Sequence, residues 1–129
     1  MTLTYTTWLL LQHPSVLDKL RTELSTVMGD SHQLPENLSA IEGLPYLTAC
    51  INESMRLFPA IPGPFPRIVP SSGLVISGYY LPGGTVVSAN ALAVHRSDHS
   101  GIWGEAPEEY RPERWLGAEA DVVLMRKTL

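Results

Sequence analysis

Four prolines and a glycine fall within a short central stretch of the chain, PAIPGPFPR, from Pro59 to Arg67. A proline inside a helix removes a backbone hydrogen bond and clashes with the preceding turn, so this stretch cannot be helical. It must instead be a stiff, extended passage. The chain is therefore divided here, and we expect different secondary structure on its two sides.

The residues before this passage have the spacing of helices. We expect a first helix over Thr2–Gln12, which ends near His13 because a following proline disfavours the helical conformation. Apolar residues at helical spacing predict a second helix from Pro14 up to Gly29, and Pro45 opens a third helix that runs to about Leu57. The connection between the second and third helices is polar, with one helical turn expected at Glu36–Ala40.

The residues after the passage alternate in the manner of short strands, with β-branched and aromatic side chains. Tight turns are expected at Ser77-Gly78 and at Pro82-Gly83-Gly84, which predicts a small antiparallel sheet. One helical turn is expected at Ala91–Arg96, and from Ser97 the chain becomes an irregular meander. The predicted fold class is mainly α with a small antiparallel β-sheet, that is, α+β.

The charge balance excludes one class of partner. The chain has 13 acidic and 9 basic residues and a net charge of -4, without a basic run. The positive surface expected of a nucleic-acid-binding protein is therefore missing. Cys50 is the only cysteine, so no internal disulfide framework is expected. The apolar run near the N-terminus is too short for a signal peptide or a membrane span.

The third predicted helix carries a charged pair in an apolar neighbourhood. Glu53 and Arg56 are three residues apart, so their side chains lie about one turn apart and can pair directly. The apolar face of this helix is expected elsewhere, at Leu47, Ile51, Ser54, Met55 and Phe58. Most such pairs are solvated and contribute roughly a few tenths of a kcal/mol, so the pair alone indicates no function.

A second sequence element indicates a structural role for the pair. Residues 111–115 read RPERW and residues 53–56 read ESMR, with GYYLPGGTVVSANALAVHR between them. Together they resemble the cytochrome P-450 heme-thiolate monooxygenases, most closely the fungal members. The resemblance covers nearly the whole chain, from the end of the family's I helix through its K helix and meander. It implies a partial cytochrome P-450 fold with a buried network of Glu53, Arg56 and Arg114, which locks the meander to the K helix.

The same resemblance makes residues 1–129 an internal fragment of a single cytochrome P-450 domain. Residues 1–58 would be its helical part, 59–90 the proline-rich passage and small sheet, and 91–129 the meander and tail. The implied cofactor is heme, and the implied partners are a small organic substrate and a redox partner. Full-length relatives would be expected at the endoplasmic reticulum membrane.

Two further sets of residues receive roles from the resemblance. Arg67 matches an arginine that binds a heme propionate, a role that suits its charge and fork geometry; without the resemblance, a solvated strand arginine would be the simpler interpretation. A second set matches the passage that lines the substrate pocket, although an ordinary proline-rich connection stays open as an alternative. It comprises Ala60, Ile61, Gly63, Pro64 and Phe65.

The reacting groups of the family fall outside the matched residues. The acid and alcohol pair of the I helix would precede this chain, and the cysteine loop that holds the iron would follow the meander. We therefore expect no catalytic residue and no metal ligand here, and an inactive protein at this length. Cys50 is expected to be a small buried thiol. The alternative function is a non-catalytic remnant, or a small α+β module that binds another molecule.

The stretch HRSDH contains three side chains of types that bind metals, His95, Asp98 and His99. A zinc site needs three or four converging ligands, and no further ligand is evident in the sequence, so zinc binding is not expected. His13 and His32 are most simply surface residues.

Overall fold

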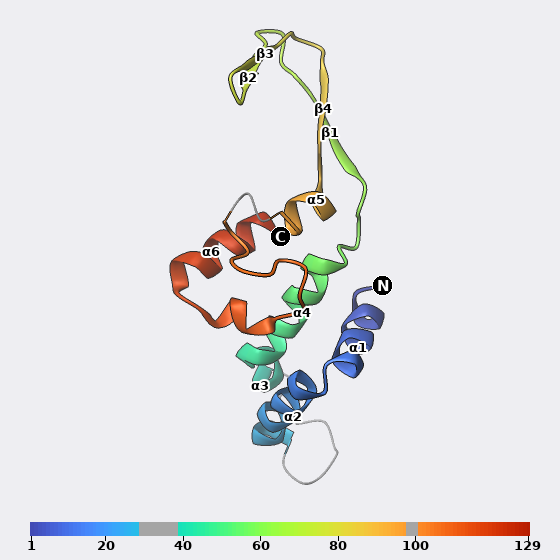
Figure 1. Ribbon diagram of the computed structural model, residues 1–129, viewed down its shortest axis with the longest axis vertical. Coiled ribbons are helices and arrows are strands. Elements are labelled where there is room, and N and C mark those ends of the chain that lie inside the picture. Colours follow the sequence, from blue (N-terminus) through green and yellow to red (C-terminus); the bar gives the residue numbers. More distant parts are fainter. Residues whose placement is uncertain (29–38, 98–100) are drawn as a thin grey trace.

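The computed structural model describes residues 1–28, 39–97 and 101–129. A body of helices occupies one end of the molecule, and a long two-stranded ribbon leads away from it (Figure 1). Pro59 follows directly after the last residues of a helix, so the division predicted at the proline-rich passage is where the helical body gives way to the ribbon.

The N-terminal part contains four helices: α1 (Thr2–Gln12), α2 (Pro14–Met28), α3 (Ser39–Glu42) and α4 (Pro45–Leu57). The predicted end of α1 and the predicted starts of α2 and α4 are confirmed, because His13, with φ and ψ of -124° and 77°, is not helical, and α2 and α4 each begin with a proline. Gly29, the predicted end of the second helix, lies outside the described residues. Most of the helical turn predicted at Glu36–Ala40 lies outside the described residues.

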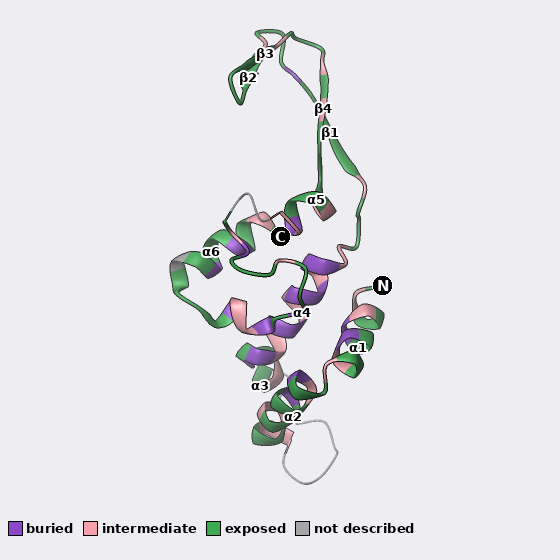
Figure 2. Cartoon of the chain, in the orientation of Figure 1, coloured by how far each residue is buried: buried purple, intermediate pink, exposed green. Residues whose placement is uncertain are grey.

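Helix α4 forms the centre of the body, and its buried face differs from the predicted one. The side chains predicted to be its apolar face are only half-buried, apart from Ser54. The buried residues are Tyr46, Ala49, Cys50, Glu53, Ser54, Arg56 and Leu57 (Figure 2). The prediction was wrong because it ranked positions by apolarity, whereas α4 turns its charged pair toward the C-terminal part of the chain.

The strands form two antiparallel pairs rather than one sheet. Strand β1 (Pro64–Ile68) pairs with β4 (Val86–Asn90), and β2 (Leu74–Ile76) pairs with β3 (Tyr79–Leu81) at the far end of the ribbon (Figure 1). The turn predicted at Ser77-Gly78 is confirmed by φ angles of 50° and 84°, the left-handed values of a tight hairpin.

The turn at Pro82-Gly83-Gly84 does not fold β4 back onto β3. Instead Gly84 N donates to Val69 O at 3.0 Å, and Val69 N donates to Thr85 O at 2.9 Å. These bonds place β4 beside β1 in the register in which Ile68 pairs with Val86. Strand β1 accepts its two prolines because each strand of a two-stranded ribbon has a free edge, where a missing N–H costs nothing.

The C-terminal part begins with α5 (Ala91–His95), where Asn90 Oδ1 accepts from Ala93 N at 3.2 Å as an N-cap. Residues 101–111 form no helix or strand and lead to the 3-10 helix η1 (Pro112–Leu116), which is followed by α6 (Glu119–Thr128). Helix α6 was not predicted, because the last segment was expected to be a tail. The helix buries Val122 and Met125 at helical spacing, and Met125 packs with Ala49, Trp103 and Trp115.

A second cluster of buried side chains joins α1, α2 and α4, and it includes Leu9, Leu20 and Leu57. Large apolar side chains are exposed on the hairpin, where Val75 is 62% and Tyr79 is 76% exposed. Within the three described stretches, none of the helices has the length and apolar run that a membrane crossing requires.

Candidate functional site

The charged pair of α4 is completely buried. Arg56 Nε lies 2.8 Å from Glu53 Oε2 and Arg56 Nη2 lies 2.9 Å from Glu53 Oε1, so the guanidinium and the carboxylate make two parallel hydrogen bonds. Both side chains are 0% exposed. The spacing of three residues places the two side chains one turn apart, and the planar fork of arginine fits a carboxylate in this bidentate way.

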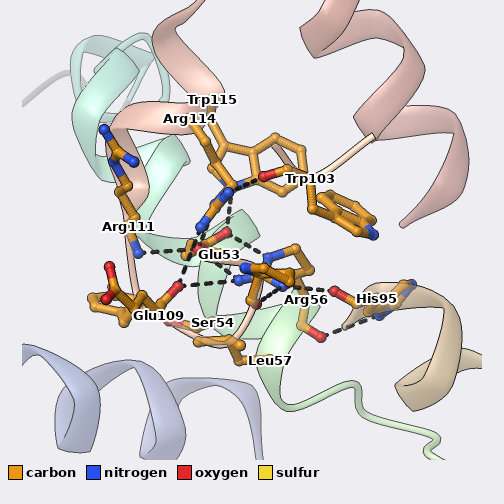
Figure 3. Close-up of polar contacts among 12 residues, drawn as sticks. Glu53, Ser54, Arg56, Leu57, His95, Trp103, Glu109, Arg111, Arg114 and Trp115 are labelled. Carbon is orange, nitrogen blue, oxygen red and sulfur yellow. Dashed lines mark hydrogen bonds and ion pairs between the residues drawn. The ribbon is translucent and has the colours of Figure 1, made fainter. Parts of the chain in front are cut away.

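The segment around η1 brings further donors to the same carboxylate (Figure 3). Arg114 Nε lies 2.8 Å from Glu53 Oε1, and the backbone N of Arg111 lies 3.0 Å from it. Trp115 Nε1 donates to Glu53 Oε2 at 2.9 Å. The indole bond was not predicted, although Trp115 directly follows Arg114 in the sequence.

The environment of Glu53 has opposing effects on its charge. Burial raises the pKa of its carboxyl, but the hydrogen bonds and charge of Arg56, the charge of Arg114 and the N–H of Arg111 outweigh that effect. The pKa therefore lies below its ordinary value, and the carboxylate is ionised at neutral pH.

The arginines use their remaining donors on backbone carbonyls of α5 and of residues 101–111. Arg56 Nη1 lies 2.6 Å from both His95 O and Pro107 O, and the same guanidinium stands 5.3 Å from the centre of the Trp103 ring. Arg114 donates to Trp103 O, and its Nη2 lies 3.2 Å from Ala106 O. Residues 101–111, which lead into η1, contain no helix or strand, so these bonds fix their path.

Two other glutamates attach α2 to this unit, and neither was predicted from the sequence. Glu23 accepts from Tyr46 N at 2.8 Å and Leu47 N at 2.9 Å, which caps the N-terminus of α4. Glu113 Oε1 lies 2.6 Å from Lys19 Nζ and 2.9 Å from Tyr46 Oη. Burial raises the pKa of Glu113, but its hydrogen bonds, first that of Lys19, lower it below the ordinary value.

Comparison with known proteins identifies the family. The sequence model of the cytochrome P450 family matches residues 1–127. The chain belongs to the cytochrome P450 family. It is 42% identical over 123 residues to a cytochrome P450 monooxygenase of Aspergillus flavus, covering 93% of this chain and 24% of that protein. It is also 42% identical over 118 residues to the monooxygenase BOT1 of Botryotinia fuckeliana, covering 92% of this chain and 22% of that protein.

Among solved structures, a zebrafish cytochrome P450 determined with progesterone matches with a TM-score of 0.73 and 32% identity. The match covers 91% of this chain and 26% of that one. The predicted partial cytochrome P450 fold and the resemblance to fungal members are thus confirmed. The chain spans about a quarter of the length of these relatives.

The predicted propionate ligand of this P450 chain, Arg67, is not part of the buried network around Glu53. Arg67 lies exposed on β1, where its Nη1 donates to Pro66 O at 2.9 Å. It borders a hollow of about 470 Å³ between the ribbon and the hairpin, together with Phe65, Ile76 and Val87. Its position leaves the guanidinium accessible to an anionic group.

Three of the residues predicted to line the P450 substrate pocket, Ala60, Ile61 and Phe65, border one hollow of about 390 Å³ with Met55 of α4. Gly63 and Pro64, predicted with them, are not among its lining residues. The hollow is open, since Ile61 is 62% and Phe65 is 42% exposed. The predicted role of all five residues stays a prediction.

The residues of metal-binding type do not form a site in the described part of this P450 chain. Cys50 is 0% exposed, and burial raises the pKa of its thiol to about 11, so it has little thiolate to offer a metal. The sequence stretch considered for zinc binding contains His95, Asp98 and His99. Asp98 and His99 lie outside the described residues. Among the described residues no three side chains are grouped to hold a metal ion.

Proposed function

We propose that this chain is the K-helix and meander part of a longer, fungal-type monooxygenase that inserts one atom of dioxygen into a small organic substrate. The observation that carries the proposal is the fully buried carboxylate of Glu53, which joins Arg56 of α4 to Arg114 of η1. A charged network at the centre of the body is a costly arrangement, and the family match explains why this sequence has it.

The role of the network is to fix the meander against α4. Removing one partner of a buried ion pair strands the other charge and costs about 3–5 kcal/mol. Since both guanidinium groups donate to backbone carbonyls of the stretch before η1, its path depends on that pairing. In the longer protein we expect this path to support the heme-binding part of the fold.

Family membership implies heme as the cofactor of the full-length protein. Heme, when bound through a thiolate, supplies the activation of dioxygen. Arg67 fits the propionate role, because its guanidinium is exposed and one local bond to Pro66 O leaves other donors free. Cys50 does not fit the thiolate role, since it is buried and its pKa is raised.

The proposal also includes the substrate pocket, the redox partner and the location of the full-length protein. Ala60, Ile61, Gly63, Pro64 and Phe65 would contribute to the substrate pocket, supported by the hollow that three of them share. A redox partner would deliver electrons to the full-length protein, which we propose to lie at the endoplasmic reticulum membrane.

A chimera tests the proposal. The segment of the Aspergillus flavus relative that aligns with this chain is replaced by residues 1–129, and the absorbance of the ferrous carbonyl form is recorded. We expect a thiolate-type Soret band from the chimera and its loss in the Glu53→Ala variant. The matched control is Asp18→Ala, which removes a pair with Arg21 at the same spacing on an exposed helix face. A normal band from Glu53→Ala would contradict the proposal.

We also propose that the 129 residues alone are inactive. Heme added to the purified chain is expected to give no thiolate-type band. A band that disappears in Cys50→Ala would contradict this. The alternative, a non-catalytic module, would be favoured if the chimera failed to bind heme while the isolated chain folded as a stable monomer.

A further inference from the structure

Ala106 has a backbone conformation that an alanine rarely adopts. Its φ is 52°, in the left-handed region, where the Cβ atom of a residue is crowded. The next residue is Pro107, and a residue before proline is normally pushed towards extended conformations. The chain is also left-handed at Gly101 and Gly104, with φ of 65° at each, but glycine adopts this region freely. The backbone of Ala106 is therefore strained.

The turn that follows Ala106 does not require this conformation. Glu109 N donates to Ala106 O at 3.1 Å, which closes a turn over residues 106–109. Such a turn sets the angles of its two central residues, Pro107 and Glu108, and not those of its first residue. The side chain of Ala106 is exposed, so packing of its methyl group does not offset the strain. The cause lies in the contacts of its backbone.

The guanidinium of Arg114 binds the backbone at the strained residue. Its Nη1 donates to Trp103 O (Figure 3), and its Nη2 lies 3.2 Å from Ala106 O. Its Nε lies 2.8 Å from Glu53 Oε1, so the ion pair sets the position of the guanidinium. The side chain of Arg114 is only 6% exposed, and hydrogen bonds from a charged donor are stronger than those between neutral groups. These bonds offset the strain of Ala106.

The other arginine of the network binds the later part of the turn. Arg56 Nη1 lies 2.6 Å from Pro107 O, and Arg56 Nη2 lies 3.2 Å from Glu109 O. Arg114 Nη2 lies 3.3 Å from the same oxygen of Glu109, so this carbonyl has two donors. Residues 107–109 therefore stay attached to α4 when the donors of Arg114 are lost.

We propose that residues 103–106 form a strained strap, which Arg114 holds in place and which relaxes when its guanidinium is withdrawn. Glu53 positions Arg114, and Arg114 keeps Ala106 left-handed, so the buried ion pair and the backbone at the surface change together. Three residues of the strap also line a hollow of about 440 Å³: Trp103, Gly104 and Glu105. Relaxation of the strap would change the shape of this hollow. The strap does not depend on the proposed monooxygenase activity.

The first test reads the backbone conformation directly. In a left-handed residue the amide proton lies close to its own Hα, so NMR of the labelled 129-residue chain shows a strong cross-peak between them. Ala106 is expected to show the strong cross-peak in the wild type and a weak one in Arg114→Lys, which keeps the charge but loses the fork of donors. A weak cross-peak in the wild type, or a strong one in Arg114→Lys, would overturn the proposal.

Ser77 serves as the internal control. Its φ of 50° is also left-handed, and it lies exposed in the turn between β2 and β3. Its strong cross-peak is expected in both the wild type and Arg114→Lys. A change at Ser77 equal to that at Ala106 would reject the strap, because the effect of Arg114 would then not be specific to residues 103–106.

The second test measures the strain as stability. Ala106→Gly is compared by urea unfolding in the wild type and in Arg114→Lys, so that the greater freedom of glycine in the unfolded chain cancels. The replacement should be more favourable in the wild type, by about fivefold in the unfolding equilibrium constant, because only there does it relieve strain. Ser77→Gly should have the same effect in both backgrounds. An equal effect of Ala106→Gly in both would overturn the proposal.

Ala106→Val decides if Arg114→Lys does not fold. A β-branched residue is disfavoured more strongly than alanine in the left-handed region, and at this exposed position the change costs no packing. The strap should then leave its position, and the Arg114 Nε–H signal in the NMR spectrum should broaden while that of Arg56 stays sharp. An Arg114 signal as sharp as that of Arg56 would overturn the proposal.

Discussion

Trp115 Nε1 lies 2.9 Å from Glu53 Oε2, although the two residues are 62 positions apart in the chain. Both side chains are buried, so the indole N–H has no water to replace this acceptor. Trp115 is therefore the second side chain from outside α4, after Arg114, that donates to the carboxylate of Glu53.

Replacing Trp115 with phenylalanine tests this bond. The ring is largely kept, but one donor to a charged acceptor is lost, which costs about 1.5–3 kcal/mol. Urea unfolding of the isolated chain measures the change. Trp8→Phe is the control, because Trp8 is 49% exposed, and it should cost clearly less. Equal losses at the two positions would mean that the indole bond contributes nothing.

Glu23 of α2 is expected to stabilise the protein by capping the N-terminus of the neighbouring helix α4. Glu23→Ala leaves the N–H groups of Tyr46 and Leu47 without their acceptor, with an expected loss of roughly 1–2 kcal/mol. Glu23→Gln, which keeps one acceptor oxygen, should lose less. Thermal unfolding of both variants, beside Glu42→Ala on the exposed helix α3, checks the order. A Glu23→Ala variant as stable as Glu42→Ala would show that the cap is unimportant.

The lowered pKa of Glu53 predicts acid sensitivity. Its folded pKa lies below the unfolded value, so the stabilisation is present above the unfolded pKa, near 4.3, and is lost as pH falls through the folded pKa. Unfolding free energies measured from pH 7 down to pH 2 should show this loss in the wild type. Glu53→Gln should be less stable at pH 7 and should depend less on pH in this range. Parallel curves would contradict the assignment.

The thiol of Cys50 is expected to be unreactive in the folded protein. Burial raises its pKa to about 11, and the side chain is 0% exposed. A thiol-specific reagent at about pH 8, below the ordinary thiol value of about 8.5, should modify the unfolded chain in urea quickly and the folded chain only at the rate of opening. Rapid modification without urea would show that the core around α4 is open.

The sequence predicted those features that depend on local chemistry. Pro14 and Pro45 mark helix starts because proline fixes its own φ, and Ser77-Gly78 marks a hairpin because glycine tolerates the positive φ of a tight turn. The pairing of β4 with β1 is not local and was not predicted. The buried face of α4 was misassigned, since a charged pair reads as exposed until its distant partner is known.

The candidate site was predictable only in part for the same reason. The contact of Arg114 with Glu53 followed from the family resemblance, not from spacing. Lys19 and Glu113 are 94 residues apart, and nothing in either neighbourhood marks them as partners. Helix α6 was missed because Val122 and Met125, the buried residues among those whose side chains are described, give too short an apolar pattern to stand out.

A double-mutant cycle between Glu53 and Arg114 tests the buried network most directly. Unfolding free energies are compared for the wild type, Glu53→Gln, Arg114→Gln and the double variant, with Asp18 and Arg21 as a matched exposed pair. Residues in one buried network should couple at the upper end of about 0.5–3 kcal/mol, whereas the exposed pair should give a few tenths. A coupling energy near zero between positions 53 and 114 would contradict the network.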